Sequence, residues 1–188
     1  MHIIRFLTED HRNISALLAR VPAAIDDPAE LDHLRTLISE HLSRHAAVEE
    51  QLFYPALLDV ADGDRLEVLR ALEDHHVVEQ SLLEALALPT GDERLAPKLL
   101  LLADAVPRHV EQEEEVLFDL ARRLLKEPQL EQLGEQAEAV KEAAPTRPHP
   151  HLTGRPKWQQ ALGGPIGLID QALSTGRRVV SQTFGGAR

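Results

Sequence analysis

The sequence predicts an all-α protein: an up-down-up-down four-helix bundle with a short extra helix and a partly irregular C-terminal tail. Three observations lead to this prediction. Apolar residues in the first 144 positions recur with a helical period, Pro and Gly cluster where the period breaks, and the breaks are short. Short connections make neighbouring helices antiparallel, and four such helices bury their apolar faces most simply as a bundle.

The composition also favours helices over sheets. Of the 188 residues 43% are apolar but only 3% are aromatic, so Leu, Ala, Val and Ile must fill the interior. A chain of this length is sufficient for one domain with a substantial core.

Pro, Gly and Asp residues set the ends of the predicted helices. The four long helices are expected over about Ile3 to Val21, Ala29 to Leu58, Asp64 to Leu88, and Asp92 to Leu125. A fifth, shorter helix is predicted over Gln129–Glu142, packed outside the bundle. Pro107 lies inside the fourth helix, where its ring and missing N–H are expected to kink the backbone.

The charge divides the chain near residue 144. Residues 1–144 carry a net charge of −16, whereas residues 145–188 carry +5 and contain seven of the ten glycines. The stretch at 145–151, Pro-Thr-Arg-Pro-His-Pro-His, cannot be helical and predicts an extended linker. We therefore expect an acidic domain at 1–144 and a Pro/Gly-rich basic C-terminal extension at 145–188.

Charge and composition exclude several classes of function. A net charge of −11 repels a phosphate backbone, so neither nucleic acid nor an anionic membrane is expected as a partner. The absence of cysteine excludes a disulfide scaffold, a thiolate zinc site, an iron–sulfur cluster and a cysteine nucleophile. The sequence contains no run of 18 apolar residues, so it predicts no membrane span. The apolar stretch at 1–7 is too short for a signal peptide. A cytoplasmic protein is the expectation.

Two segments of the chain repeat each other at one constant offset. Glu9-Asp10-His11 recurs as Glu73-Asp74-His75, and His45-Ala46-Ala47-Val48-Glu49-Glu50 recurs as His109-Val110-Glu111-Gln112-Glu113-Glu114. The separation between His11 and His45 is therefore the same as that between His75 and His109. The bundle is predicted to consist of two similar helix pairs, each with a His on its first helix and a His-x3-Glu pair on its second.

The chemistry of metal binding explains why these residue types occur at this spacing. Residues four apart on a helix share one face, so each His-x3-Glu pair presents an imidazole beside a carboxylate. Two such pairs facing each other, with one further His from each copy, supply four imidazoles and two carboxylates that can bridge two cations. The predicted metal ligands are His11, His45, Glu49, His75, His109 and Glu113. Iron suits this set, and manganese and zinc are compatible with it.

Other interpretations of the same residues stay open at this point. One His-x3-Glu pair alone is usually an exposed surface pair, and a metal-free helical interaction module would make the whole repetition a coincidence. His76 competes with His75 but points about 100° away and breaks the spacing of the repeat. Glu50 and Glu114 also recur, and we expect them on the helix surface or behind the ligands rather than on the metal.

Four motifs occur in order along the chain: Asp10-His11, His45-x3-Glu49-Glu50 followed by Leu52-Phe53-Tyr54-Pro55, Glu73-Asp74-His75-His76-Val77-Val78, and His109-x3-Glu113-Glu114-Glu115 with Leu117-Phe118. In these motifs, over about residues 3–125, the chain resembles the hemerythrin-like HHE cation-binding domain. The resemblance implies a four-helix bundle around a non-haem centre of two iron ions, oxo- or hydroxo-bridged when oxidised. The residues after 144 look like a C-terminal extension of some bacterial members.

Two departures from the oxygen-carrying members of this family bear on function. Those members have a fifth histidine one turn after the third-helix ligand and an Asp in the fourth-helix pair, where this chain has Glu79 and Glu113. Reversible O2 carriage is therefore disfavoured, and Glu79 is either a further ligand or a solvent-facing charge. The expected function is to bind and react with O2, hydrogen peroxide or nitric oxide in a protective or sensing role. Peroxidase-like, catalase-like or oxidase activity is left open.

In an alternative function, the chain acts through a protein partner. The chain would then be an iron or oxygen sensor, or an iron store, without catalytic turnover. The feature behind this alternative is the tail at 158–184, whose apolar residues can dock on a partner or on the bundle itself; they include Trp158, Ile166, Leu173 and Phe184.

Overall fold

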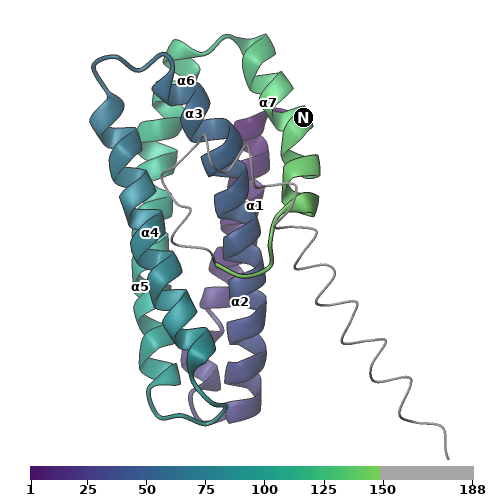
Figure 1. Cartoon of the computed structure of the whole chain (residues 1–188), viewed down its shortest axis with the longest axis vertical. Helices are drawn as coiled ribbons and strands as arrows, with labels where there is room; N and C mark the ends of the chain where they lie inside the picture. Colours follow the sequence, from purple (N-terminus) through teal and green to yellow (C-terminus); the bar gives the residue numbers. More distant parts are fainter. Residues whose placement is uncertain (149–188) are drawn as a thin grey trace, which may run out of the picture.

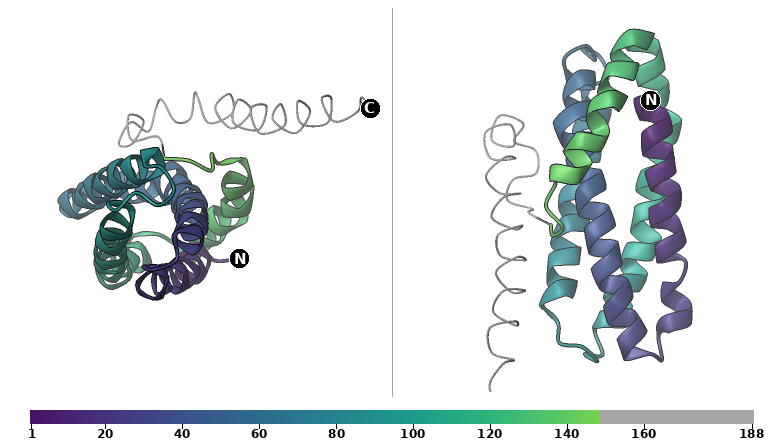
Figure 2. Two further views of the ribbon diagram at one scale, coloured as in Figure 1. Left: turned by 90° about the horizontal axis from the view of Figure 1, so that it is seen from below. Right: turned by 90° about the vertical axis from the view of Figure 1, so that its right-hand side faces the viewer.

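The structure, a computed structural model, describes residues 1–148, and within them the chain is all-helical as predicted. Four long helices form the bundle: α1 (Ile3–Leu18), α2 (Pro28–Val48), α4 (Arg65–Ala87) and α5 (Leu95–Gln112). Successive long helices run in opposite directions around one core (Figures 1 and 2). The predicted docking segment at 158–184 lies outside the described residues.

Two of the long helices are extended by matching π-helical turns. The turn η2 (Glu49–Phe53) joins α2 to α3 (Tyr54–Leu58), and η3 (Glu113–Leu117) joins α5 to α6 (Phe118–Leu124). In both, the backbone N–H that follows the turn donates five residues back, from Tyr54 to Glu49 and from Phe118 to Glu113. The predicted long helices over 29–58 and 92–125 are therefore continuous helical runs that each contain one wider turn.

The helix ends follow local capping rules and shift the predicted boundaries by a few residues. Helix α1 ends at Leu18, before a 3-10 turn, η1 (Val21–Ala24), that contains Pro22. Helix α2 begins at Pro28 because the Asp27 side chain accepts hydrogen bonds from the first free N–H groups. Helix α5 begins at Leu95 rather than at Asp92, and it continues through Pro107.

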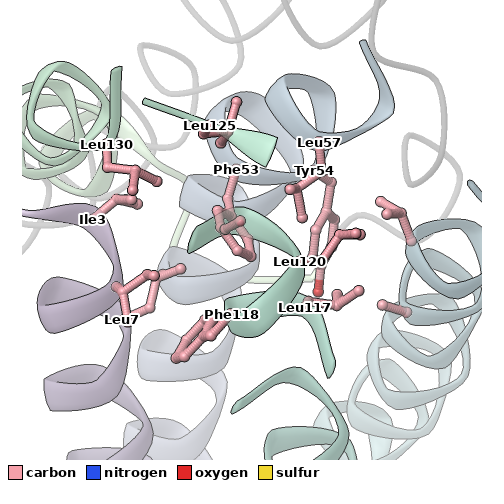
Figure 3. Packing of buried hydrophobic residues seen from close by; sticks show 14 of the residues in the cluster. Ile3, Leu7, Phe53, Tyr54, Leu57, Leu117, Phe118, Leu120, Leu125 and Leu130 are labelled. Atoms are coloured by element: carbon pink, nitrogen blue, oxygen red, sulfur yellow. The ribbon is translucent and has the colours of Figure 1, made fainter. Parts of the chain in front are cut away.

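The apolar core consists of two clusters, one in each half of the bundle. The upper cluster, at the end where α3 and α6 lie, includes Leu7, Phe53, Tyr54, Leu57, Leu72, Leu117 and Phe118 (Figure 3). The lower cluster includes Ile14, Leu34, Ile38, Leu42, Leu82, Leu99 and Val106. Polar residues separate the two; on α1, for example, His11 lies between Leu7 of the upper cluster and Ile14 of the lower one.

A fifth long element, α7 (Glu127–Ala143), packs outside the bundle against α1 and α2, as predicted for residues 129–142 (Figure 2). Its Gly134 lies against the start of α1, where an added Cβ would come within 2.7 Å of the Ile3 backbone nitrogen. This glycine therefore permits the close approach of the two helices. After α7, residues 145–148 are not helical. Among residues 1–148, no helix combines the length and apolar character needed to cross a bilayer.

Candidate metal centre

The six predicted ligands lie together in one buried cluster between the upper and lower apolar clusters. Each is at most 8% exposed, and the carboxylates of Glu49 and Glu113 are fully buried. Helices α1 and α4 each contribute one histidine. The remaining donors come from the two places where an α-helix passes into a π turn.

The π turns begin at the two glutamates of the cluster. His45 lies in the last turn of α2 and Glu49 opens η2, with His45 Nε2 3.0 Å from Glu49 Oε2. His109 and Glu113 repeat this arrangement at the end of α5, with Nε2 3.4 Å from Oε2. In a π turn successive side chains diverge by less than in an α-helix, so a glutamate and its following residue can both face the bundle interior.

The donor atoms form two groups of four that share both glutamates. The first position consists of His11, His45, Glu49 and Glu113; the second position consists of His75, His109, Glu49 and Glu113. Within each group, one donor atom from every residue lies within 4.8 Å of the others. Because the glutamates belong to both groups, each carboxylate is placed where it can bridge two neighbouring cations.

A carboxylate also lies at the outward-facing nitrogen of every imidazole. Glu114 Oε1 lies 2.9 Å from His11 Nδ1, and Glu50 Oε1 lies 3.0 Å from His75 Nδ1. The aspartates that precede His11 and His75 approach the other two rings, with Asp10 3.7 Å from His45 Nδ1 and Asp74 4.0 Å from His109 Nδ1. A carboxylate that accepts from Nδ1–H leaves the Nε2 lone pair directed toward the cluster, which is how metal-binding imidazoles are usually oriented.

These outer carboxylates were only partly anticipated from the sequence. Glu50 and Glu114 were expected on the surface or behind the ligands, and each contacts a histidine of the opposite repeat. Asp10 and Asp74 received no role, although the Asp-His dipeptide recurs with the repeat. That recurrence was the signal available for them.

The cluster contains buried donor atoms that the described residues do not satisfy. His11 Nε2, His45 Nε2, both oxygens of Glu49 and Glu113 Oε2 are buried without a hydrogen-bond partner. They approach one another to 3.0–3.6 Å without hydrogen-bond geometry. Unsatisfied buried polar atoms are costly, so a set of them converging on one point fits a bound cation. The donors, imidazole and carboxylate, fit iron, manganese or zinc.

In the metal-free cluster, burial and neighbouring charges shift the pKa values of the predicted ligands. Burial lowers the pKa of His11, but the carboxylates of Glu113 and Glu49 outweigh burial and raise it to about 10. The pKa values of His45 and His75 are also raised by neighbouring carboxylates against the effect of burial. Burial raises the pKa of Glu49, yet His45, His11 and His75 hold it well below its usual range. Burial lowers the pKa of His109, so the histidines differ.

The two positions have different aromatic neighbours at equivalent points of the repeat. Tyr54 follows η2, and its hydroxyl donates to Glu113 and lies 3.1 Å from His75 Nε2. In Figure 3 this hydroxyl points away from Leu57. The counterpart of Tyr54 in the second copy of the repeat is Phe118, whose ring stacks on His11 with the planes 5° apart. Burial, followed by the charges of Glu113 and Glu49, raises the pKa of Tyr54 well above its usual value.

A small apolar pocket reaches the cluster from the side of the lower cluster. It has a volume of about 20 Å³, and its walls include Ile14, Leu42, Leu82 and Val106. Both histidines of the second position line it, whereas only His45 does so from the first. A pocket of this size accommodates a molecule comparable to water.

The structure places His75, His76 and Glu79 differently relative to the cluster. His75 lies in the cluster, whereas the neighbouring His76 is exposed on α4. Glu79 lines the pocket but belongs to neither group of four donors.

Comparisons with known proteins agree with this geometry. The family model of the hemerythrin HHE cation binding domain matches residues 2–121. A DNA nickase of Nostoc sp. is 29% identical over 166 residues, which are 87% of this chain but 42% of that relative. An uncharacterized hemerythrin-like protein of Schizosaccharomyces pombe is 21% identical over 156 residues, or 82% of this chain and 76% of that protein. No solved structure gives a significant match.

Proposed function

The chain belongs to the hemerythrin HHE cation-binding family, and from this premise we propose that it holds two iron ions that react with small oxidants. The observation that carries the proposal is the pair of four-donor groups sharing Glu49 and Glu113. We infer that O2, hydrogen peroxide or nitric oxide is the reactant and that the role is protective or sensing, in the cytoplasm. Manganese or zinc would fit the same donors.

The proposed roles of the ligands follow from their contacts. His11 and His45 would hold one ion, and His75 and His109 the other, each ring oriented by the carboxylate at its Nδ1. Glu49 and Glu113 would bridge the two ions. When bound, the iron supplies the electrons for the reaction, and the surrounding residues control what reaches it.

The pocket supports a small, uncharged reactant. Its apolar walls favour O2 or nitric oxide over ions, and its volume of about 20 Å³ suffices for a molecule of that size. The pocket is lined by His75 and His109, and the Tyr54 hydroxyl lies beside His75. We infer that the reactant meets the second position, beside the Tyr54 hydroxyl, which donates its hydrogen bond to Glu113.

An optical titration tests this function. The protein is loaded with ferrous iron without air, exposed to air, and returned to argon, with spectra recorded at each stage. We expect a visible absorption change that argon does not reverse, which signifies a reaction. A change that argon fully reverses would indicate carriage instead, and no change with iron bound would overturn the proposal. Glu115→Gln, an exposed position on η3, is the matched control and should behave as the parent protein.

A sensor or store acting through a protein partner is the second candidate function. It is favoured by the opposite charges of the two parts of the chain, −16 for residues 1–144 and +5 for residues 145–188, which allow the extension to dock and be released. Limited proteolysis with and without iron tests it. Cleavage within 149–188 that changes with iron supports a sensor, and cleavage that ignores iron contradicts it.

The relative named as a DNA nickase does not lead us to propose DNA as a substrate. This chain spans less than half of that relative, and its helical domain is strongly acidic. We expect the iron-loaded protein neither to retard duplex DNA in a gel nor to nick a supercoiled plasmid. Nicking that disappears in Glu49→Gln would contradict this expectation.

A further inference from the structure

One charged contact reaches the cluster from outside the four-helix bundle. Lys141, on α7, donates a hydrogen bond through Nζ to Asp10 Oδ1. Asp10 is 5% exposed, and its other oxygen lies 3.7 Å from His45 Nδ1, an ion-pair distance at which the two buried atoms do not form a hydrogen bond. A continuous series of contacts therefore connects α7, through Asp10 and His45, to the first position.

Packing of α7 holds Lys141 in this place. The Lys141 Nζ atom lies 5.2 Å from the centre of the Phe6 ring on α1, and its side chain is 26% exposed. Along α7, Leu130, Gly134 and Ala137 are buried, and Gly134 sets the close approach to the start of α1. Since the backbone of α7 is fixed against α1, the ammonium group does not depend on its ion pair alone for its position.

Within residues 1–148, no equivalent contact occurs at the second position. Asp74 corresponds to Asp10 in the repeat and lies 4.0 Å from His109 Nδ1. Its side chain is 42% exposed, and within residues 1–148 it forms no ion pair with a lysine or arginine. The two histidines of the His-x3-Glu pairs therefore have outer carboxylates that are anchored to different degrees.

We propose that Lys141 is a positioning residue that holds Asp10 against His45 and so makes the first position bind a metal ion more tightly than the second. This inference rests on the proposed function. An outer carboxylate fixes the orientation of a ligating imidazole and strengthens it as a donor, and the loss of such a partner commonly lowers metal affinity by roughly 10- to 100-fold. Helix α7 lies beyond residues 2–121, the part of the chain that the family model matches, so that match does not cover the anchor.

Titration of the metal-free full-length protein with Co²⁺, followed by visible absorption, tests the inference. The parent protein should bind two ions in two resolved steps. In Lys141→Met the tighter step should weaken by about ten-fold or more while the weaker step is unchanged. Lys141→Arg keeps a cation beside Asp10 and should restore the tighter step.

Lys98→Met is the matched control. Lys98 has nearly the same fractional exposure, 25%, and also pairs with a carboxylate, that of Glu84, but it lies on α5 away from the cluster. It should leave both steps unchanged. An Asp10→Asn variant should show the same loss as Lys141→Met, and the double variant should show no further loss, because both changes break the same series of contacts.

The outcomes separate the inference from the function on which it rests. If the parent protein binds no Co²⁺, the proposed metal centre is wrong. If it binds two ions but in one unresolved step, or if Lys141→Met weakens both steps equally or neither, the metal centre stands and the anchoring role of Lys141 is overturned. Thermal unfolding of the metal-free variants establishes that each one is folded.

Discussion

The first and second positions share two bridging candidates and the same repeated backbone, but their surroundings differ. Phe118 stacks on His11 at the first position, and Lys141 reaches it through Asp10. At the second, the Tyr54 hydroxyl lies beside His75, and both His75 and His109 line the pocket, whereas only His45 does so from the first. The repeated residues form the two groups of possible metal donors, and the residues that are not repeated make the surroundings of the two positions different.

The largest effect, a loss of bound metal, is expected from changing a glutamate that both positions share. Glu49→Gln should reduce the metal content from two ions per chain to nearly none, because Glu49 belongs to both groups of donors. Elemental analysis of protein loaded without air measures this. Retention of one full ion per chain in this variant would show that Glu49 contributes to only one of the two positions.

Changing one histidine of each pair should remove one ion and leave the other. His109→Ala should remove the ion of the second position, leaving about one per chain, and should lower the thermal stability of the loaded protein because metal binding is coupled to folding. His45→Ala should remove the ion of the first position. Iron loading that is unchanged in His109→Ala would count heavily against the ligand assignment.

In the metal-free protein, the pH dependence of stability should differ between variants of the two positions. The raised pKa of His11 means that its contribution to stability is complete below pH 6.5 and is lost as the pH rises to about 10. The lowered pKa of His109 has the opposite sign, so its contribution is lost as the pH falls below 6.5. Melting temperatures between pH 7 and 10 should therefore decline, less steeply in His11→Gln than in His109→Gln. Equal slopes in both variants would contradict this difference.

Exchanging Tyr54 and Phe118 should have a moderate effect on stability and on the rate of the reaction with oxidant. Tyr54→Phe loses a buried hydrogen bond to Glu113, which costs about 1 kcal/mol of stability, and should slow the reaction with oxidant while leaving both ions bound. Phe118→Tyr places a new hydroxyl at the equivalent point beside His11 and should not restore the rate when combined with Tyr54→Phe. Stopped-flow absorption of samples with equal iron content provides the measurement, and full recovery in the double variant would mean that the two positions are interchangeable.

The smallest effect is expected beside the second position. His76→Ala should leave the metal content unchanged and alter stability by less than about 0.5 kcal/mol, because the side chain is exposed. His75→Ala, one residue earlier, should remove an ion. A loss of metal in His76→Ala would reverse the choice between the two histidines.

Much of the bundle and the composition of the cluster could be predicted because both depend on spacing along helices. Helical periodicity located the long helices, and the constant offset between the two copies of the repeat selected the same six residues that the structure buries together. Their role as ligands remains a prediction. Helix ends were less accurate, as at Leu18 and Leu95, because capping depends on individual hydrogen bonds.

Other features depend on contacts that spacing does not encode. Both π turns open with the repeated Glu-Glu pair, but such a pair is also common in ordinary α-helices and does not by itself predict a π turn. Tyr54 and Phe118 occupy equivalent positions of the repeat, and only their neighbours in space show that Tyr54 is a hydrogen-bond donor to the cluster. The contact of Lys141 with Asp10 joins residues 131 positions apart, which no local pattern reveals.

The separation of the core into upper and lower clusters has a consequence for the cooperativity of folding. The layer of imidazoles and carboxylates between them interrupts apolar contact along the whole bundle axis. In the metal-free protein we expect the two ends to open as separate units with different amide hydrogen-exchange rates. Bound ions would link ligands from four helices, so the same amides should then exchange together, and the chain should unfold as one unit rather than two.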